Sequence, residues 1–170
     1  LRDIWARAAR LVGRVATMIP VDPCAVYVYD EVKGYGTSAL AIGKNAEALR
    51  SRCVAPGEGV TGFALANRRA INQIHPSLDF VGVELEPGTQ YRCMVTLPLC
   101  KDELLLGALS VYSTELSEYT DDNMRLLETV TRLASDALAN AMQHAQAEST
   151  ALTDPPHGPA NYRCLRVGSQ

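Results

Sequence analysis

Long apolar runs are missing from this chain, and so is any excess of charge of one sign. No apolar stretch approaches the ~20 residues needed to cross a bilayer, and the start of the chain is amphipathic, unlike the short apolar core of a signal peptide. The 16 Lys and Arg residues are balanced by 19 Asp and Glu, for a formal net charge of −3. We therefore expect neither nucleic acid nor membrane as a partner, and we expect a cytoplasmic location.

Paired metal-ligand motifs are absent as well. The five cysteines are an odd number, widely spaced and without a CxxC arrangement: Cys24, Cys53, Cys93, Cys100 and Cys164. A disulfide framework or a zinc site has a different spacing, so most of these cysteines are expected to be small buried side chains in a reducing compartment. The acidic residues Glu58, Asp79, Glu84 and Glu86 have no spacing that demands a metal. The sequence predicts no metal site and specifies no cofactor.

What the chain does contain is enough apolar material for one core. It has 170 residues, of which 47% are hydrophobic and 21% charged, as expected for one ordinary globular domain. The chain begins at Leu1 without Met. We therefore expect it to be a piece of a longer protein.

Apolar periodicity predicts helices at both ends of the domain. In residues 1–19, one stripe contains Ile4, Ala8, Leu11, Val15 and Met18, and a second contains Trp5, Val12 and Ile19. Thr120 is a good N-cap for a helix over 121–148, whose apolar face is also double and turns Ala-rich toward its end. A helix that only covers a sheet needs one stripe, so the second predicts a parallel homodimer through the terminal helices. The alternative is that the second stripe packs within the same chain, against the other terminal helix.

Between these helices the pattern favours strands joined mostly as hairpins. Strands are predicted at 25–29, 37–42, 70–74, 92–99 and 104–112, and a short helix at 60–67 follows the turn Pro56–Gly59. Residues 44–53 are ambiguous, and 75–90 form a long connection of the kind that often acts as a lid. The expected fold class is α+β: an antiparallel sheet with both terminal helices packed on one face, and the short helix and long loop on the other.

Three stretches resemble motifs of the GAF domain family. Residues 56–64 resemble its "G-x-G-[IV]-x-G-x-[AV]" turn into a short helix. Residues 93–99 resemble its "S-x-L-x-V-P-L" strand, with Cys93 in place of the usual serine, and residues 106–111 resemble "[IL]-G-V-L-x-[LV]". The likeness covers about residues 20–145 and is specific at the level of the fold.

A second resemblance lies at the end of the chain, where residues 153–163 are similar to the entry of a GGDEF diguanylate cyclase domain. The matching positions are Thr153, Asp154, Pro155, Gly158, Asn161 and Arg163. The chain stops at Gln170 before any signature loop, so no cyclase activity is expected here. We therefore expect a GAF-like sensor domain over 1–150, and a linker or truncated start of a GGDEF-like output domain over 151–170.

The resemblance implies a regulatory, non-catalytic sensor domain that binds a small molecule, dimerises, or both, and so controls a C-terminal output domain. The ligand-binding candidates are Phe63, Asn72, His75, Phe80, Tyr91, Arg92 and Cys93. Simpler interpretations stay open: His75 as polar surface, Tyr91 and Arg92 as caps of the sheet edge, and Cys93 as a buried core residue. Haem-binding relatives carry a histidine shortly before the Cys93 strand, and positions 85–92 hold none.

Two other functions stay open. GAF-fold reductases of free methionine-R-sulfoxide share the stretch "C-x-x-x-P-x-G-x-G-V-C-G", in which Cys53 matches the first cysteine and Thr61 occupies the second. Their further cysteine has no counterpart between His75 and Gln90, so the thiol chemistry of that family is not expected here. The third possibility is a structural dimerisation domain whose cavity is filled by its own side chains.

Overall fold

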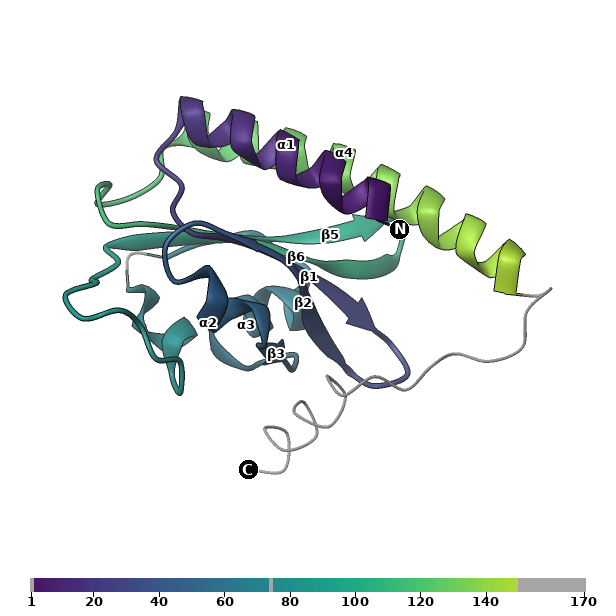
Figure 1. Ribbon diagram of the computed structural model, residues 1–170, viewed down its shortest axis with the longest axis horizontal. Helices are drawn as coiled ribbons and strands as arrows, with labels where there is room; N and C mark the ends of the chain where they lie inside the picture. The colour runs from purple at the N-terminus through teal and green to yellow at the C-terminus, as the bar shows by residue number, and fades with distance from the viewer. Residues whose placement is uncertain (1, 74, 150–170) are drawn as a thin grey trace.

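The computed structural model describes residues 2–73 and 75–149, and these form a six-stranded antiparallel sheet with helices on both faces (Figure 1). The strand order is β3-β2-β1-β6-β5-β4. The elements, in chain order, are α1 (Arg2–Met18), β1 (Cys24–Asp30), β2 (Tyr35–Ile42), α2 (Ala46–Arg50), β3 (Cys53–Val54), α3 (Gly59–Asn67), β4 (Ile71–Gln73), the 3₁₀ helix η1 (Pro76–Phe80), β5 (Cys93–Lys101), β6 (Leu104–Ser113) and α4 (Asp121–Ser149). The predicted α+β class and antiparallel sheet are confirmed.

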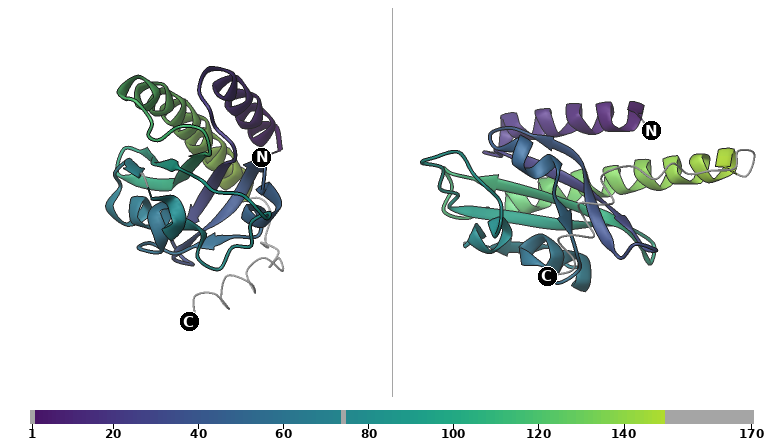
Figure 2. Two further views of the ribbon diagram at one scale, coloured as in Figure 1. Left: turned by 90° about the vertical axis from the view of Figure 1, so that its left-hand side faces the viewer. Right: turned by 60° about the horizontal axis from the view of Figure 1, so that its bottom comes forward.

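The terminal helices α1 and α4 lie side by side over one face of the sheet (Figure 2). Alternate residues of β5 point toward them, because successive side chains of a strand face opposite sides. The core on this face buries Cys93, Val95, Leu97 and Leu99 of β5 together with residues of β1, β6 and both helices. The sheet therefore separates this core from a second one on its other face.

The second core lies under α2, α3 and η1. It contains Tyr27, Leu49, Leu65, Met94 and Tyr112, each at most 2% exposed. Tyr27 and Tyr112 come from the central strands β1 and β6, so bulky phenol rings cover the middle of the sheet on this face. This is the face on which a small-molecule pocket was expected.

Several elements differ from the sequence-based expectation. The ambiguous stretch 44–53 contains the short helix α2 and leads into β3 at the edge of the sheet, and the long connection after β4 contains η1. Both are too short for periodicity to identify. The reciprocal hydrogen bonds of Thr120 and Asn123, 3.1 and 3.2 Å long, begin α4 as the capping pattern predicted.

The two predicted stripes of α1 are not divided between the sheet and a partner in the expected way. The buried residues are Val12, Val15 and Ile19, which come from both stripes, and Met18 of the first stripe is 65% exposed. The axis of α1 relative to the sheet decides which face is buried, and sequence periodicity does not define that rotation. The side chain of Trp5 and the GGDEF-like residues 151–170 lie outside the described part of the molecule.

Within residues 2–73 and 75–149, no helix has both the length and the apolar character that crossing a membrane requires.

Candidate functional site

A buried aspartate forms the centre of the face covered by α2, α3 and η1. The Asp79 side chain, on η1, is completely buried and accepts hydrogen bonds from Arg52, Thr61 and Tyr112. The Arg52 guanidinium donates to both carboxylate oxygens, Nη1 to Oδ2 at 3.1 Å and Nη2 to Oδ1 at 3.3 Å. Thr61 donates from its backbone N–H to Oδ1 and from Oγ1 to Oδ2, both at 2.9 Å, and the Tyr112 hydroxyl donates to Oδ2.

These contacts determine the charge states of the cluster. Burial by itself would raise the pKa of Asp79, but the Arg52 charge and the hydrogen bonds from Arg52, Thr61 and Tyr112 outweigh it and lower that pKa. Burial, and then the neighbouring Asp79 charge, raise the pKa of Tyr112 well above its usual value. The site therefore holds a carboxylate and a guanidinium as ions, and Tyr112 as a neutral hydrogen-bond donor.

A chain of hydroxyl groups continues the cluster across the sheet. The Thr61 Oγ1 lies 2.6 Å from the Ser110 Oγ, which lies 2.8 Å from the Thr96 Oγ1. All three side chains are fully buried. Because Ser110 is on β6 and Thr96 on β5, the polar network joins α3 and η1 to these two neighbouring strands.

Aromatic rings hold the segment after η1 against the sheet. The Phe80 ring stacks on Tyr91 with centroids 5.0 Å apart, and it lies 4.8 Å from the Tyr112 ring. Asn45, just before α2, donates from Nδ2 to the Tyr91 hydroxyl at 2.8 Å and accepts from the Glu86 N–H at 2.7 Å. The long connection is thus fixed at both ends by side chains from distant parts of the chain.

Four of the predicted ligand-binding residues come together around a hollow of about 460 Å³ at the outer edge of this segment. His75, Phe80, Tyr91 and Arg92 line it with Pro76, Ser77, Leu85, Thr89 and Gln90. The volume lies within the ~300–1,000 Å³ usual for small-molecule sites. The Arg92 guanidinium also donates to the Glu115 carbonyl at 3.0 Å, so it joins the hollow to the end of β6, in agreement with the capping interpretation.

Phe63 belongs to a different hollow, on the other side of η1. It is 52% exposed and lines a space of about 590 Å³ together with Arg52, Gly59, Val60, Ile71, Leu78 and Val81. The first hollow and this one share no lining residue, and η1 lies between them because Pro76, Ser77 and Phe80 face one and Leu78 faces the other.

Asn72 and Cys93 are placed away from both hollows. The Asn72 Nδ2 donates to the Tyr119 carbonyl at 2.8 Å and so attaches β4 to the loop before α4. Cys93 is fully buried in the core under the terminal helices, on the opposite face of the sheet. Of the two interpretations of Cys93, the structure agrees with the buried core residue, because its register on β5 directs the side chain away from the face with the two hollows. Burial raises the pKa of its thiol, which disfavours the reactive thiolate.

Sequence reasoning missed the residues at the centre of the site. Arg52, Tyr112 and Asp79 were not predicted as site residues, and Thr61 was considered only as a replacement for a catalytic cysteine. Arg52, Thr61 and Tyr112 lie 27, 18 and 33 positions from Asp79 along the chain, and no motif links the four residues. The one local signal is that Asp79 stands between the apolar residues Leu78 and Phe80 in a short helical turn.

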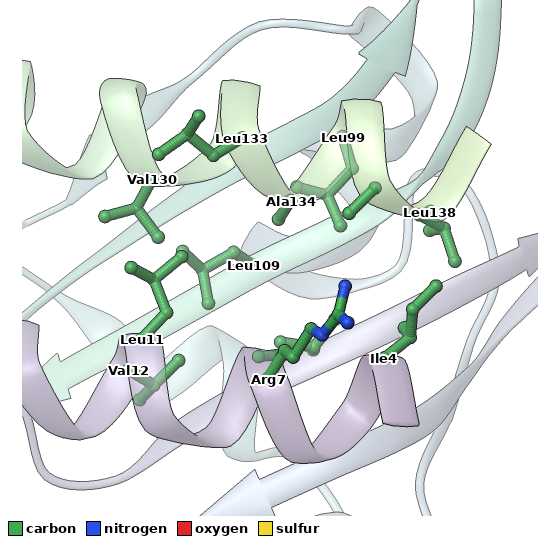
Figure 3. A pocket seen from close by; sticks show the side chains of 13 residues that line it. Ile4, Arg7, Leu11, Val12, Leu99, Leu109, Val130, Leu133, Ala134 and Leu138 are labelled. Carbon is green, nitrogen blue, oxygen red and sulfur yellow. The ribbon is translucent and has the colours of Figure 1, made fainter. Parts of the chain in front are cut away.

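An apolar groove separates α1 from α4 on the opposite face. It holds a cavity of about 100 Å³, and Figure 3 shows side chains from both helices directed into it. The lining residues are Ile4, Arg7, Ala8, Leu11 and Val12 of α1, Val26, Leu99 and Leu109 of the sheet, and Val130, Leu133, Ala134, Ala137 and Leu138 of α4. Leu133 is 55% exposed, so part of this apolar surface faces outward.

In the described part of the chain, no three His, Cys, Asp or Glu side chains are grouped so that they could hold a metal ion.

Solved structures with similar folds include GAF domains of larger proteins and free methionine-R-sulfoxide reductases. The GAF domain of a phosphoenolpyruvate-protein phosphotransferase from Coxiella burnetii is 20% identical, with a TM-score of 0.66, covering 88% of this chain and 94% of that chain. The GAF domain of a two-component sensor histidine kinase from Bacillus halodurans is 12% identical, with a TM-score of 0.62, covering 85% and 97%. Free methionine-R-sulfoxide reductase from Neisseria meningitidis, solved with its substrate, is 17% identical, with a TM-score of 0.66, covering 83% and 81%.

At these identities the structural likeness establishes the fold alone. No curated protein matches the sequence. The GAF domain family, in contrast, matches residues 6–139, which is most of the chain and extends from the second turn of α1 to residue 139 within α4. No match to a diguanylate cyclase domain accompanies it. The chain therefore belongs to the GAF domain family.

Proposed function

We propose that this GAF domain is a non-catalytic sensor that binds a small molecule beneath residues 75–92 and associates with a second copy through α1 and α4. The observation that carries the proposal is the apolar groove between the terminal helices. The groove is lined almost entirely by aliphatic side chains, and Leu133 on its α4 side is 55% exposed, so a partner helix would remove this apolar side chain from water.

Covering this groove with a second copy of the chain is more favourable than leaving it in contact with solvent. Burial of apolar surface contributes ~25 cal/mol per Å², and a two-fold axis along the helices would place equivalent apolar residues such as Leu133 against each other. The small residues Ala134 and Ala137 on α4 permit close approach of a neighbouring helix. A parallel arrangement would also direct both chain ends the same way, as needed to bring two output domains together.

Strands β5 and β6 connect the polar network on one face of the sheet with the terminal helices on the other. On β6, Ser110 and Tyr112 contact the polar network, while their neighbours Leu109 and Val111 pack under the terminal helices. On β5, Thr96 and Val95 are divided between the faces in the same way. We propose that ligand binding shifts these strands and thereby changes the packing of α1 and α4. The diguanylate-cyclase-like output domain rests only on the resemblance of residues 153–163 and is part of this proposal.

Light scattering tests the dimer. We expect the wild-type protein to be dimeric at tens of micromolar, and Leu133→Glu to be monomeric but folded, because a charge in the groove opposes its burial. Val32→Glu, at a 97% exposed position in the β1–β2 turn, is the matched control and should remain dimeric. A monomeric wild-type protein would refute the association. Val15, which is buried in the core, is a poor probe because its charged variant would unfold.

The absence of catalysis is tested separately. The Thr61 hydroxyl, at the position of the reductases' second cysteine, is engaged by Asp79 and Ser110, which supports a structural role. We expect the protein neither to reduce methionine sulfoxide with thiol reductants nor to make cyclic di-GMP from GTP. Methionine sulfoxide turnover that is lost in Cys53→Ser would instead establish the reductase alternative.

One observation favours the third possibility, a dimerisation domain without a ligand. Asp79, Phe80 and Tyr112 fill the space over the central strands with the protein's own side chains. Chemical rescue of Asp79→Ala by carboxylates distinguishes side chains that fill this space permanently from side chains that a ligand can displace.

A further inference from the structure

Asp79 is held in the way that proteins hold a bound carboxylate. The described hydrogen bonds to Asp79 come from Arg52, Thr61 and Tyr112. Arg52 lies just before β3, Thr61 on α3 and Tyr112 on β6, so none of these donors belongs to η1, which carries Asp79. The guanidinium binds in the two-pronged geometry typical of arginine and carboxylate. The carboxylate is thus received by a cradle built from the rest of the domain.

The backbone at the start of α3 leaves room for this carboxylate. Gly59 has a φ of 65°, and a Cβ there would lie 2.9 Å from Asp79 Oδ1 and 3.1 Å from the Leu78 carbonyl. The Thr61 N–H, one of the free donors in the first turn of the helix, points at the same oxygen. The cradle therefore combines a buried cation, a helix N-terminus and two hydroxyl donors around one anionic group.

The helix η1, which carries Asp79, is the segment that separates the two hollows. The hollows of about 460 and 590 Å³ lie on its two sides. Leu78 and Val81, on its outer side, are 60% and 79% exposed. Besides Asp79, the contacts described for η1 are its packing on α3, the buried Pro76, and the stacking of Phe80 on Tyr91 and Tyr112. If η1 moved outward, the two hollows would join over Tyr27, Met94 and Tyr112.

We propose that Arg52, Thr61 and Tyr112 form a binding site for the carboxylate of a small organic acid, and that Asp79 occupies this site as an internal stand-in until the ligand displaces it. The inference rests on the proposed function, because it names the ligand class and the closing device of the same site. One carboxylate replaces another, so Arg52 is never left buried without a counter-charge, and the released Asp79 is hydrated on the outside.

The charge of the cradle and the side chains around it indicate which class of ligand the site would bind. The cradle contains one guanidinium and accommodates one negative charge, which a monocarboxylate matches. A neutral ligand would leave Arg52, whose side chain is only 11% exposed, without a partner. The floor is made of aromatic and aliphatic side chains, Tyr27, Leu65, Met94 and Tyr112, so the body of the acid should be apolar.

Chemical rescue tests this site. Asp79→Ala should lower the melting temperature by about 10 °C, because it leaves Arg52 unpaired. Sodium formate, acetate or propionate should raise it again by several degrees at ~100 mM, whereas sodium chloride at equal ionic strength should not. Asp136→Ala, which removes the carboxylate of the exposed pair with Lys101, is the matched control and should gain nothing. In Arg52→Met/Asp79→Ala the carboxylate effect should vanish.

Hydrogen exchange on the wild-type protein provides the second measurement. Benzoate at tens of millimolar should accelerate exchange of the amides of residues 76–82 while the Thr61 amide stays protected, since the ligand then accepts its hydrogen bond. Carboxylates that act no better than chloride on Asp79→Ala would overturn the inference. If Asp79→Ala folds neither with carboxylate nor with chloride, the hydrogen-exchange measurement on the wild-type protein decides. An unchanged exchange rate over residues 76–82 would then overturn the inference. Neither result affects the dimer, which Leu133→Glu tests independently.

Discussion

At the scale of single residues, the most consequential position is Asp79. A buried carboxylate is stable only with a cation and enough hydrogen bonds, and here Arg52, Thr61 and Tyr112 supply them. Arg52 depends on Asp79 in turn, because the Asp79 charge raises the pKa of the guanidinium against the effect of its own burial. Neither ion would be stable in this position without the other.

Acid should weaken the protein through this pair. The pKa of Asp79 is lower in the folded state than in the unfolded chain, so its contribution is fully present above its unfolded pKa of ~3.9 and is lost as the pH falls through the folded value. Urea denaturation of Asp79→Asn at neutral pH should show a loss of about 3–5 kcal/mol, with a flatter decline in acid than the wild type. Asp136→Asn, at an exposed ion pair, should lose less than ~1 kcal/mol. Equal losses in the two variants would contradict the assignment.

At the scale of elements, α1 and α3 show how packing overrides local preference. Both contain a glycine in helical conformation, and alanine is the better helix former. A Cβ on Gly13 of α1 would meet nothing within 4 Å. A Cβ on Gly62 of α3 would lie 2.4 Å from the Ala55 carbonyl, because α3 turns back onto the loop before it. That close approach positions Thr61 against Asp79.

The same substitution should therefore have opposite effects in the two helices. Gly13→Ala should stabilise the domain by about 0.5–1 kcal/mol, through helix propensity alone. Gly62→Ala should destabilise it by about 1–3 kcal/mol, because the backbone must shift to admit the methyl group. Denaturant titrations of both variants check the signs. Stabilisation by Gly62→Ala would mean that the Ala55 loop yields easily and does not hold Thr61 in place.

At the scale of the whole molecule, the sheet separates two environments of different character. The helices α1 and α4 cover one face, and α2 and α3 lie on the other (Figure 1). The first face carries the apolar groove, and the second carries the buried ionic network under η1. Strands β5 and β6 contribute side chains to both environments, so a shift of either strand on one face also moves residues on the other face. The proposed ligand site and the proposed association surface therefore lie on opposite faces of this sheet.

Association through the groove should make stability depend on protein concentration. We expect the melting temperature of the wild type to rise as the concentration increases from about 1 to 100 μM, since mass action favours the state that binds a second copy. Leu133→Glu should show no such rise, and Val32→Glu should behave as the wild type. A concentration-independent wild-type melting temperature would argue against the dimer interface.

The sequence by itself determined the parts of the fold that depend on neighbours along the chain. Alternation and turn residues identified the hairpin of β5 and β6, and Thr120 marked the start of α4, because pairing and capping there involve residues close in sequence. The structure brings His75, Phe80, Tyr91 and Arg92 around one hollow because the connection between β4 and β5 carries all four.

Only the tertiary structure decided which faces these elements bury and what the site contains. The register of β5 turned Cys93 toward the terminal helices, and the rotation of α1 buried Val12, Val15 and Ile19 rather than either whole stripe. Asp79 became the centre of the site because folding brought Arg52, Thr61 and Tyr112 around it from three other elements. A buried charge can be recognised only with its partners, and these are distant in sequence.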